Sequence, residues 1–559
     1  MKVRKHRSKA EKSTSSTDTI KGIGESLLTR LESFFESNKN IIASIILLIN
    51  VLFAFALFDV KISEANDDSL YVEGAYNFAK DYRNYFSANA PLYPMILSIP
   101  IKLFGLNIII LKFFSLLFSA LHVFFLYKAF SKRVPYTVLF SMLAIVSVNS
   151  YFQYFASQTF TESFFLMVQA LMIWAFVKVI ENERNDQLKY SWKNWLHLGL
   201  MVFIATLSKN LATVTVVAGI FYFLIYKQWK QIAYFLSSFI LVRLVYEGIR
   251  FTIWGAQNQF SSQSSIVLQK DPYDPSKGME TFDGFIGRLF DNLNIYLSKR
   301  FYQILGFISE DSQVAKGGLA FITIVLFVWA FIIVIKNKNR FLVLTGLYAM
   351  TMAGTMCLAL QIKWDQPRMI MVYVPFILLI FFSGLYYAFQ KKSSFLQLFL
   401  PIIAVLIFGS SFIKTIGKAS DRLPVVQKNL KGDIYYGYTT DWQNYLQMSA
   451  YVADSLDENS YVACRKAPMS FVYGKGKSFY PVYTVFHSDP DSVLYTFKEA
   501  GVTHVMIASL RRNPKKVDGY IINTMHRLLN PVTQKYPQKL KLIKQIGVQE
   551  PAYLYEINY

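Results

Sequence analysis

The stretch Asn66-Asp67-Asp68-Ser69-Leu70-Tyr71 follows the first long apolar segment of the chain. An aromatic-rich run comes after it and ends in Pro91-Leu92-Tyr93-Pro94. In a chain dominated by hydrophobic segments, two adjacent carboxylates at a membrane boundary indicate either a solvated loop or a reaction centre. The pair alone leaves both interpretations open, so the rest of the sequence has to separate them.

The composition is that of a membrane protein with a soluble part. Of 559 residues, 53% are hydrophobic and 17% are charged, whereas soluble proteins carry about 25% charged residues. The net charge of +22 is spread over short clusters between apolar runs, which is typical of a membrane protein and argues against a nucleic-acid surface. With only two cysteines, the sequence indicates no disulfide framework. The six histidines are scattered, and none forms a pair at the spacing of metal ligands. We therefore expect no metal and no cofactor.

Apolar segments are the main signal in the first 417 residues. Because about 20 apolar residues cross a bilayer, the sequence predicts eleven spans, near 41–60, 108–130, 134–150, 158–180, 195–208, 211–227, 231–250, 317–335, 341–360, 369–389 and 396–414. Amphipathic stretches near 94–106 and 283–308 are expected to be surface or re-entrant helices. A further stretch around 27–35 predicts either a helix on the membrane surface or a simple helical extension.

The charges of the loops predict how the spans are oriented. With the basic N-terminus in the cytoplasm, every loop that should be inside carries Lys or Arg, as the positive-inside rule requires; these loops are 131–133, 181–194, 226–230, 336–340 and 391–392. Three regions follow: a cytoplasmic tail and amphipathic helix (1–40), a transmembrane domain with outer loops 61–107 and 251–316 (41–417), and an extracytoplasmic domain (418–559).

The last region, 418–559, is more polar and has only short apolar runs, a pattern that predicts a small α/β domain. Apolar runs at 461–464, 503–507 and 552–557 are expected to be strands. Helical patterns around 440–456, 490–500 and 517–529 alternate with them.

Polar residues recur near the outer ends of the predicted spans. Glu162 begins the fourth span, Lys209 lies between the fifth and sixth, and Arg368 begins the tenth, so all three should share one membrane face with Asp67 and Asp68. For Lys209 or Arg368 alone, interfacial snorkelling is an equal explanation. An unpaired carboxylate buried in an apolar segment is costly, which favours a functional role for Glu162.

Taken in order, these motifs resemble the GT-C glycosyltransferases of the protein O-mannosyltransferase and lipid A aminoarabinose transferase type. The resemblance rests on Asp67-Asp68, Tyr71, Pro91-Leu92-Tyr93, Thr161-Glu162-Ser163, Ser208-Lys209 and Arg368 before Val374-Pro375. It implies a polytopic α-helical membrane protein with a C-terminal α/β extracytoplasmic domain. One motif departs: Asn89-Ala90-Pro91 replaces the acidic-Lys-Pro element of the aminoarabinose transferases, so neither zinc nor their substrate is carried over.

The resemblance also implies an activity. Such enzymes move a sugar from a polyprenyl-phosphate donor to an acceptor hydroxyl on a glycan, lipid or protein at the outer face of the bilayer, with inversion. Asp67 is then the expected base, and Asp68 orients the loop or acts on its neighbour through like-charge repulsion. Lys209 and Arg368 are expected to bind the donor phosphate, and Glu162, Tyr71 and Tyr93 the substrate.

A transporter or flippase of lipid-linked glycans is the alternative. Such proteins usually show internal repeats and charged or broken helices at mid-membrane. The sequence shows no repeat by eye, and its polar residues gather at one face.

Overall fold

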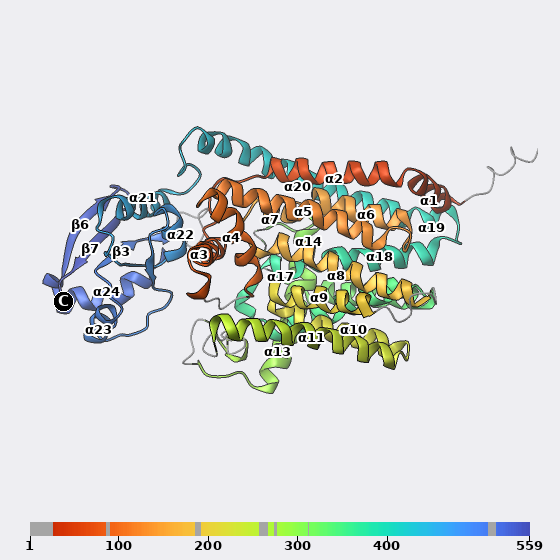
Figure 1. Cartoon of the computed structure of the whole chain (residues 1–559). Helices are drawn as coiled ribbons and strands as arrows, with labels where there is room; N and C mark the ends of the chain where they lie inside the picture. Colours follow the sequence, from red (N-terminus) through yellow and green to blue (C-terminus); the bar gives the residue numbers. More distant parts are fainter. Residues whose placement is uncertain are drawn as a thin grey trace, which may run out of the picture.

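The computed structural model describes residues 26–84, 90–184, 192–255, 266–272, 277–310, 312, 314–511 and 521–559. Asn89 of the motif above lies outside these residues. Long helices run side by side in one part of the molecule, and the C-terminal α/β domain lies against one end of them (Figure 1). The chain is therefore built as a helical domain with a small domain at its end.

Seven helices in the described part of the chain are long and apolar enough to cross a membrane. They are α2 (Lys39–Ala56), α5 (Ile108–Phe130), α8 (Thr161–Arg184), α11 (Trp229–Trp254), α15 (Gly317–Lys336), α16 (Arg340–Ala359) and α20 (Phe399–Leu430), the last continuing α19 (Ser394–Gln397). Together they confirm a multi-pass membrane protein.

The other predicted spans are helical but shorter. They contain α6 (Tyr136–Val148), α9 (Trp192–Ser208), η2 with α10 (Asn210–Val214 and Thr215–Ile225), and α17 with α18 (Pro367–Met371 and Val374–Phe389). The residues between the predicted spans 134–150 and 158–180 are also helical: α7 (Ser150–Ala156) follows α6 at an angle of 60°. Asn149 causes this bend: its side chain accepts from the Tyr151 amide at 3.0 Å and donates to the Ile304 carbonyl at 2.6 Å.

The basic loops meet at the end of the bundle opposite the C-terminal domain. Arg133, after α5, pairs with Glu181 of α8 at 2.5 Å, and Asn339, before α16, donates to the Arg133 carbonyl at 2.9 Å. α1 (Leu27–Ser37) lies at the same end (Figure 1). At the other end, α3 (Asp67–Lys80) and α4 (Leu92–Phe104) lie beside the C-terminal domain.

The C-terminal domain is a sheet covered by helices on both faces. Its strand order is β2-β1-β3-β7-β6, from Phe479–Pro481, Val462–Cys464, His504–Ala508, Ala552–Ile557 and Leu540–Ile546. β1 is parallel to β2 and β3, while β7 is antiparallel to β3 and β6. Side chains alternate across the sheet: α21 (Thr440–Ser455) and α22 (Ala467–Tyr473) pack on one face, and α23 (Pro490–Glu499) and α24 (Thr524–Lys535) on the other. The predicted α/β domain is confirmed.

The helix predicted over 517–529 is wrong in its first part. Ile521–Ile522 is strand β5, which pairs with β4 (Leu510–Arg511), and α24 begins only at Thr524. Residues 517–520 lie outside the described residues. Two consecutive β-branched residues favour the strand over the helix once a pairing partner is present.

Candidate functional site

The acidic pair occupies the first turn of α3. Asn66, at the N-cap, has φ 79°, a left-handed conformation that asparagine tolerates better than most residues. Carboxylates are favoured in the first turn because the helix dipole is positive there. The two carboxyl groups nevertheless diverge. Asp68 is completely buried, whereas the side chain of Asp67 is 41% exposed.

Asp68 fixes the loop that leads into α3. Its carboxyl group accepts hydrogen bonds from the amides of Ser63 at 2.8 Å and Ser69 at 3.0 Å. Burial raises the pKa of Asp68 to about 7, although the hydrogen bond from Ser63 and the ammonium of Lys112 oppose the rise. Asp68 therefore holds the turn together.

Arg368 and Asp67 form an ion pair. Pro367 starts α17, where the missing amide hydrogen of proline costs nothing. The next residue, Arg368, places Nη2 at 2.5 Å from Asp67 Oδ2. Its guanidinium also lies 5.5 Å from the centre of the Phe160 ring. The structure thus brings together two residues that the sequence placed on the same face.

Glu162 and Lys209 form a second pair beside the first. Glu162 stands in the first turn of α8 with only 3% of its side chain exposed, and its Oε1 lies 3.4 Å from Lys209 Nζ. Lys209 ends the turn between α9 and η2, over the ring of Phe165. Since Glu162 also interacts electrostatically with Arg368, the two pairs form one cluster.

Tyr71 and Tyr93 line this cluster at different depths. Their rings meet edge to face at 5.5 Å, and Tyr93, completely buried, also contacts Phe164 at 5.6 Å. Burial raises the pKa of Tyr71 far above its usual value, and the carboxylates of Glu162 and Asp67 raise it further. The Tyr71 hydroxyl therefore stays protonated and able to donate.

Two buried polar atoms of the cluster lack hydrogen-bond partners within the described residues. They are Oε2 of Glu162 and Nε of Arg368. Most buried polar groups in native proteins are paired with protein or with ordered water. One acceptor and one donor are therefore available here for a bound molecule.

Comparison with known proteins shows which fold the chain has. The family model described as dolichyl-phosphate-mannose-protein mannosyltransferase matches residues 88–246. The solved structure of the oligosaccharyltransferase AglB from Archaeoglobus fulgidus, in complex with an inhibitory peptide and a dolichol-phosphate, is 11% identical, with a TM-score of 0.52 over 84% of this chain and 70% of that one. ArnT from Cupriavidus metallidurans, bound to undecaprenyl phosphate, is 10% identical, with a TM-score of 0.53 over 92% and 97%. The chain has the GT-C fold. No curated protein sequence matches it.

One residue that supports this cluster was missed from the sequence. Lys112 of α5 is completely buried, and its Nζ donates to the carbonyls of Asp59 (2.6 Å) and Lys61 and to Oε1 of Gln158 (3.0 Å). Lys112 therefore ties the loop before Asp67 to the turn before Glu162. A lone lysine in the apolar run Ile-Ile-Ile-Leu-Lys-Phe-Phe was the available signal.

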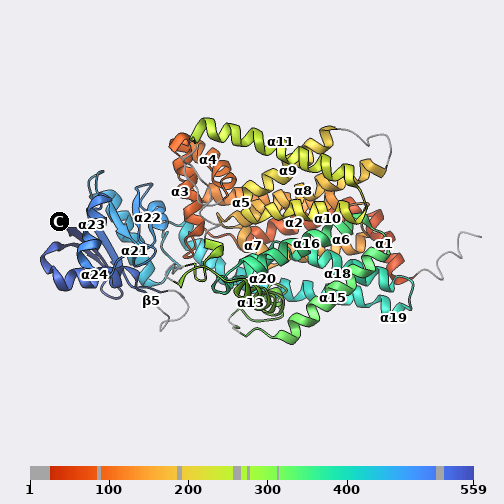
Figure 2. The same ribbon diagram turned by 90° about the horizontal axis from the view of Figure 1, so that it is seen from below.

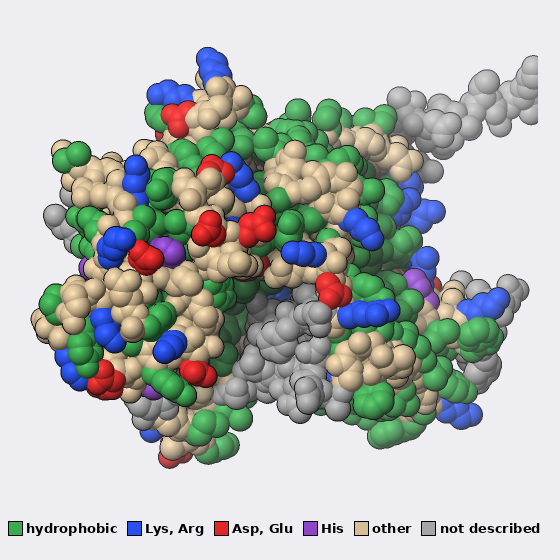
Figure 3. Space-filling model, turned by 60° about the vertical axis from the view of Figure 1, so that its left-hand side comes forward, with side chains coloured by type: hydrophobic (Ala, Val, Ile, Leu, Met, Phe, Trp, Pro, Cys, Tyr) green, Lys and Arg blue, Asp and Glu red, His purple; other side chains and the backbone are tan. Residues whose placement is uncertain are grey.

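The C-terminal domain of this GT-C protein also holds that loop. Lys466 Nζ donates to the Glu64 carbonyl at 2.8 Å, and Tyr438 Oη donates to the Ile62 carbonyl. Figure 3 turns the left-hand side of Figure 1, where the C-terminal domain lies, towards the viewer and shows acidic and basic side chains interspersed on this face. Residues of both domains therefore hydrogen-bond to the loop that leads to the acidic pair.

The described residues offer no cluster of metal-ligand side chains. Within the ranges that the structure describes, no group of three or more His, Cys, Asp or Glu side chains could hold a metal ion.

Proposed function

We propose that the chain is a membrane glycosyltransferase that moves a sugar from a polyprenyl-phosphate donor to an acceptor hydroxyl. The observation that carries the proposal is the partly exposed Asp67, paired with Arg368 beside Lys209 and the buried Glu162. A base and two cations at one end of a GT-C bundle suit this chemistry. Solved proteins of similar fold contain dolichol-phosphate or undecaprenyl phosphate, which supports a lipid-phosphate donor here.

We further propose that the cluster faces the outside of the cell membrane. The basic loops gather at the opposite end of the bundle, and the positive-inside rule assigns that end to the cytoplasm. The N-terminus is then cytoplasmic and the C-terminal domain extracytoplasmic. A donor with its tail in the bilayer would present its phosphate at the level of Arg368 and Lys209.

In the proposed reaction, the acceptor oxygen attacks the anomeric carbon of the donor while Asp67 takes the hydroxyl proton. A carbon–oxygen bond to the sugar forms as the bond between the anomeric carbon and the phosphate oxygen breaks. Attack opposite the leaving group inverts the anomeric centre. Polyprenyl phosphate departs with one more negative charge, which Arg368 and Lys209 stabilise.

The ion pairs suggest a role for each residue in this reaction. Arg368 exchanges Asp67 for the donor phosphate, which frees the carboxylate to act as base. Glu162 and Tyr71 hold sugar hydroxyls, through the unsatisfied Oε2 of Glu162 and the protonated hydroxyl of Tyr71. Asp68 and the buried Tyr93 act as positioning residues behind them.

The experiment is a transfer assay with the full-length protein in membranes and a polyprenyl-phosphate sugar. Wild type should release free polyprenyl phosphate in step with a glycosylated product. Asp67→Asn should lower transfer at least 10²-fold with insertion intact, and the exposed Asp457→Asn should not. Full activity of Asp67→Asn would overturn Asp67 as base. Movement of the lipid-linked glycan without release of polyprenyl phosphate would instead support a transporter or flippase.

A further inference from the structure

The carboxyl ends of two parallel strands, β1 and β2, lie at one edge of the C-terminal domain. Arg465 and Lys466 follow β1, and Tyr483 lies two residues beyond β2. After these residues the chain continues into α22 on one face of the sheet and into α23 on the other. In sheets of this kind, ligands bind outside the carboxyl ends of adjacent strands whose connections diverge to opposite faces. This edge is therefore a candidate ligand site.

The strand ends are next to α3, the helix that carries Asp67. In both views α22 lies beside α3 (Figure 1 and Figure 2), and the rings of Tyr76 and Phe471 meet edge to face at 5.3 Å. Lys466 interacts electrostatically with Asp67, and so does Tyr483. A molecule bound at the strand ends would therefore be close to the proposed base.

Glu73 lies on α3 near these strand ends. It interacts electrostatically with Tyr483 and with Cys464, the last residue of β1. Its side chain is partly buried and has no hydrogen-bond or ion-pair partner within the ranges that the structure describes. Burial raises the pKa of Glu73 to about 7. Near neutral pH this carboxyl group therefore both donates and accepts hydrogen bonds.

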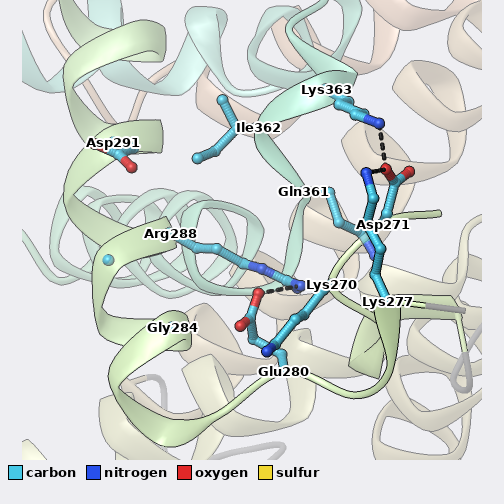
Figure 4. A pocket seen from close by; sticks show the side chains of 11 residues that line it. Lys270, Asp271, Lys277, Glu280, Gly284, Arg288, Asp291, Gln361, Ile362 and Lys363 are labelled. Carbon is cyan, nitrogen blue, oxygen red and sulfur yellow. Dashed lines mark hydrogen bonds and ion pairs between the residues drawn. The ribbon is translucent and has the colours of Figure 1, made fainter. Parts of the chain in front are cut away.

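A polar pocket of about 350 Å³ on the long loop before α15 shows the contrast (Figure 4). Two of its acids pair with cations: Glu280 with Arg288 at 2.7 Å, and Asp271 with Lys277 at 2.8 Å. A polar group taken out of water is costly unless a partner satisfies it. The carboxyl group of Glu73 thus indicates a partner that is not part of the described chain.

The aromatic ring near this carboxyl group favours a sugar as the partner. Tyr483 is 45% exposed, and the guanidinium of Arg465 lies 5.7 Å from the centre of its ring, an attraction that helps to fix the ring. The C–H groups of a sugar pack on an aromatic face, while its hydroxyl groups hydrogen-bond to carboxyl oxygens. Tyr483 and Glu73 therefore offer both kinds of contact that a sugar ring makes.

We infer that the acceptor is a carbohydrate, bound between Glu73 of α3 and Tyr483 of the C-terminal domain. One of its rings stacks on Tyr483, a hydroxyl group of the acceptor hydrogen-bonds to Glu73, and the hydroxyl group to be glycosylated reaches Asp67. Asp67 and Glu73 are about 9 Å apart along the helix axis, a distance that an oligosaccharide bridges. This inference rests on the proposed transfer reaction and names the chemical class of its acceptor.

The test measures binding of the full-length protein, purified in detergent, to immobilised oligosaccharides and to immobilised peptides that contain serine and threonine. Wild type should bind at least one oligosaccharide and no peptide. Glu73→Ala and Tyr483→Leu should each weaken that binding roughly tenfold, whereas Tyr483→Phe keeps the ring and should bind as wild type does. The controls Glu499→Ala and Tyr495→Ala remove the same groups from exposed positions on α23 and should leave binding unchanged.

Three results would overturn the inference. Wild type might bind no oligosaccharide, it might bind the peptides instead, or Glu73→Ala and Tyr483→Leu might bind the oligosaccharide as the controls do. The pair Tyr483→Leu and Tyr483→Phe keeps the test decisive should Glu73→Ala fail to fold. Because the measurement uses no donor and no release of polyprenyl phosphate, its failure is distinct from a failure of the proposed transfer.

Discussion

The guanidinium of Arg368 lies 2.5 Å from a carboxylate oxygen of Asp67, although 301 residues separate them in the chain. One is the proposed phosphate ligand and the other the proposed base, so the pair links donor binding to activation of the acceptor. The adjacent Glu162–Lys209 pair repeats the arrangement with a carboxylate that is much less exposed. The predictions below follow from these two pairs and the residues that hold them.

Arg368→Ala should weaken use of the donor more than use of the acceptor. The substitution removes the cation nearest to the leaving phosphate, so the donor KM should rise and kcat should fall. Arg368→Lys should recover part of the activity, since charge returns without the bidentate guanidinium. The measurement is the steady-state rate at varied donor concentration; an unchanged donor dependence would remove Arg368 from the site.

The effects of Glu162→Gln and Lys209→Met should not add. Their charged atoms are in contact at 3.4 Å, and contacting residues in one network show coupling of about 0.5–3 kcal/mol. Initial rates of wild type, both single variants and the double variant give the coupling in transition-state free energy. Strict additivity would mean that the two side chains act independently.

Lys112→Met should reduce kcat more than it changes the donor KM, because Lys112 positions the Asp67 loop without touching the donor. It should also destabilise the protein, since each buried acceptor left without its donor costs about 1–3 kcal/mol. Thermal unfolding in detergent measures the loss of stability. The steady-state rate at varied donor concentration measures kcat and the donor KM. Lys128→Met, at an exposed position on the same helix, is the control and should behave as wild type. A Lys112→Met enzyme with normal kcat would refute the positioning role.

Asp68→Asn should flatten the dependence of stability on pH. The folded pKa of Asp68 is raised to about 7 by burial. The folded state then keeps a proton that the unfolded state loses above about pH 4. The contribution of Asp68 to the free energy of unfolding is therefore complete below about pH 4. It falls as the pH rises towards 7, by at most about 1.4 kcal/mol per pH unit. Melting temperatures between pH 5 and 7.5 should show a shallower decline for Asp68→Asn, and parallel curves would contradict the prediction.

Lys466→Met should lower kcat from a position outside the helical domain. Its ammonium holds the Glu64 carbonyl, two residues before the helix cap at Asn66, so its loss should loosen the turn that aims Asp67. Lys475→Met, whose partner is Asp454 on the surface of the same domain, should leave the rate unchanged. Equal rates for wild type, Lys466→Met and Lys475→Met would mean that Lys466 of the C-terminal domain does not position Asp67.

Much of the fold was predictable because bilayer crossing depends on local composition. Each long apolar run before residue 417 predicted a helix, and each of these regions contains one. Contacts between distant segments decided what composition did not indicate: Asn149 ends α6 and starts α7, and Ile521–Ile522 pairs with β4 where the sequence predicted a helix. Such contacts join distant segments, so the periodicity of a single stretch does not reveal them.

The sequence by itself determined the helices, the basic loops, the α/β domain and the single end that Asp67, Glu162, Lys209 and Arg368 share. Those features follow from hydropathy and from position relative to the spans. Only the tertiary structure decided which cation meets which carboxylate, and that adjacent Asp67 and Asp68 enter different surroundings. Pairing and burial depend on how α3, α5, α8, α17 and the C-terminal domain pack together, and the energy of a charge is set by that packing.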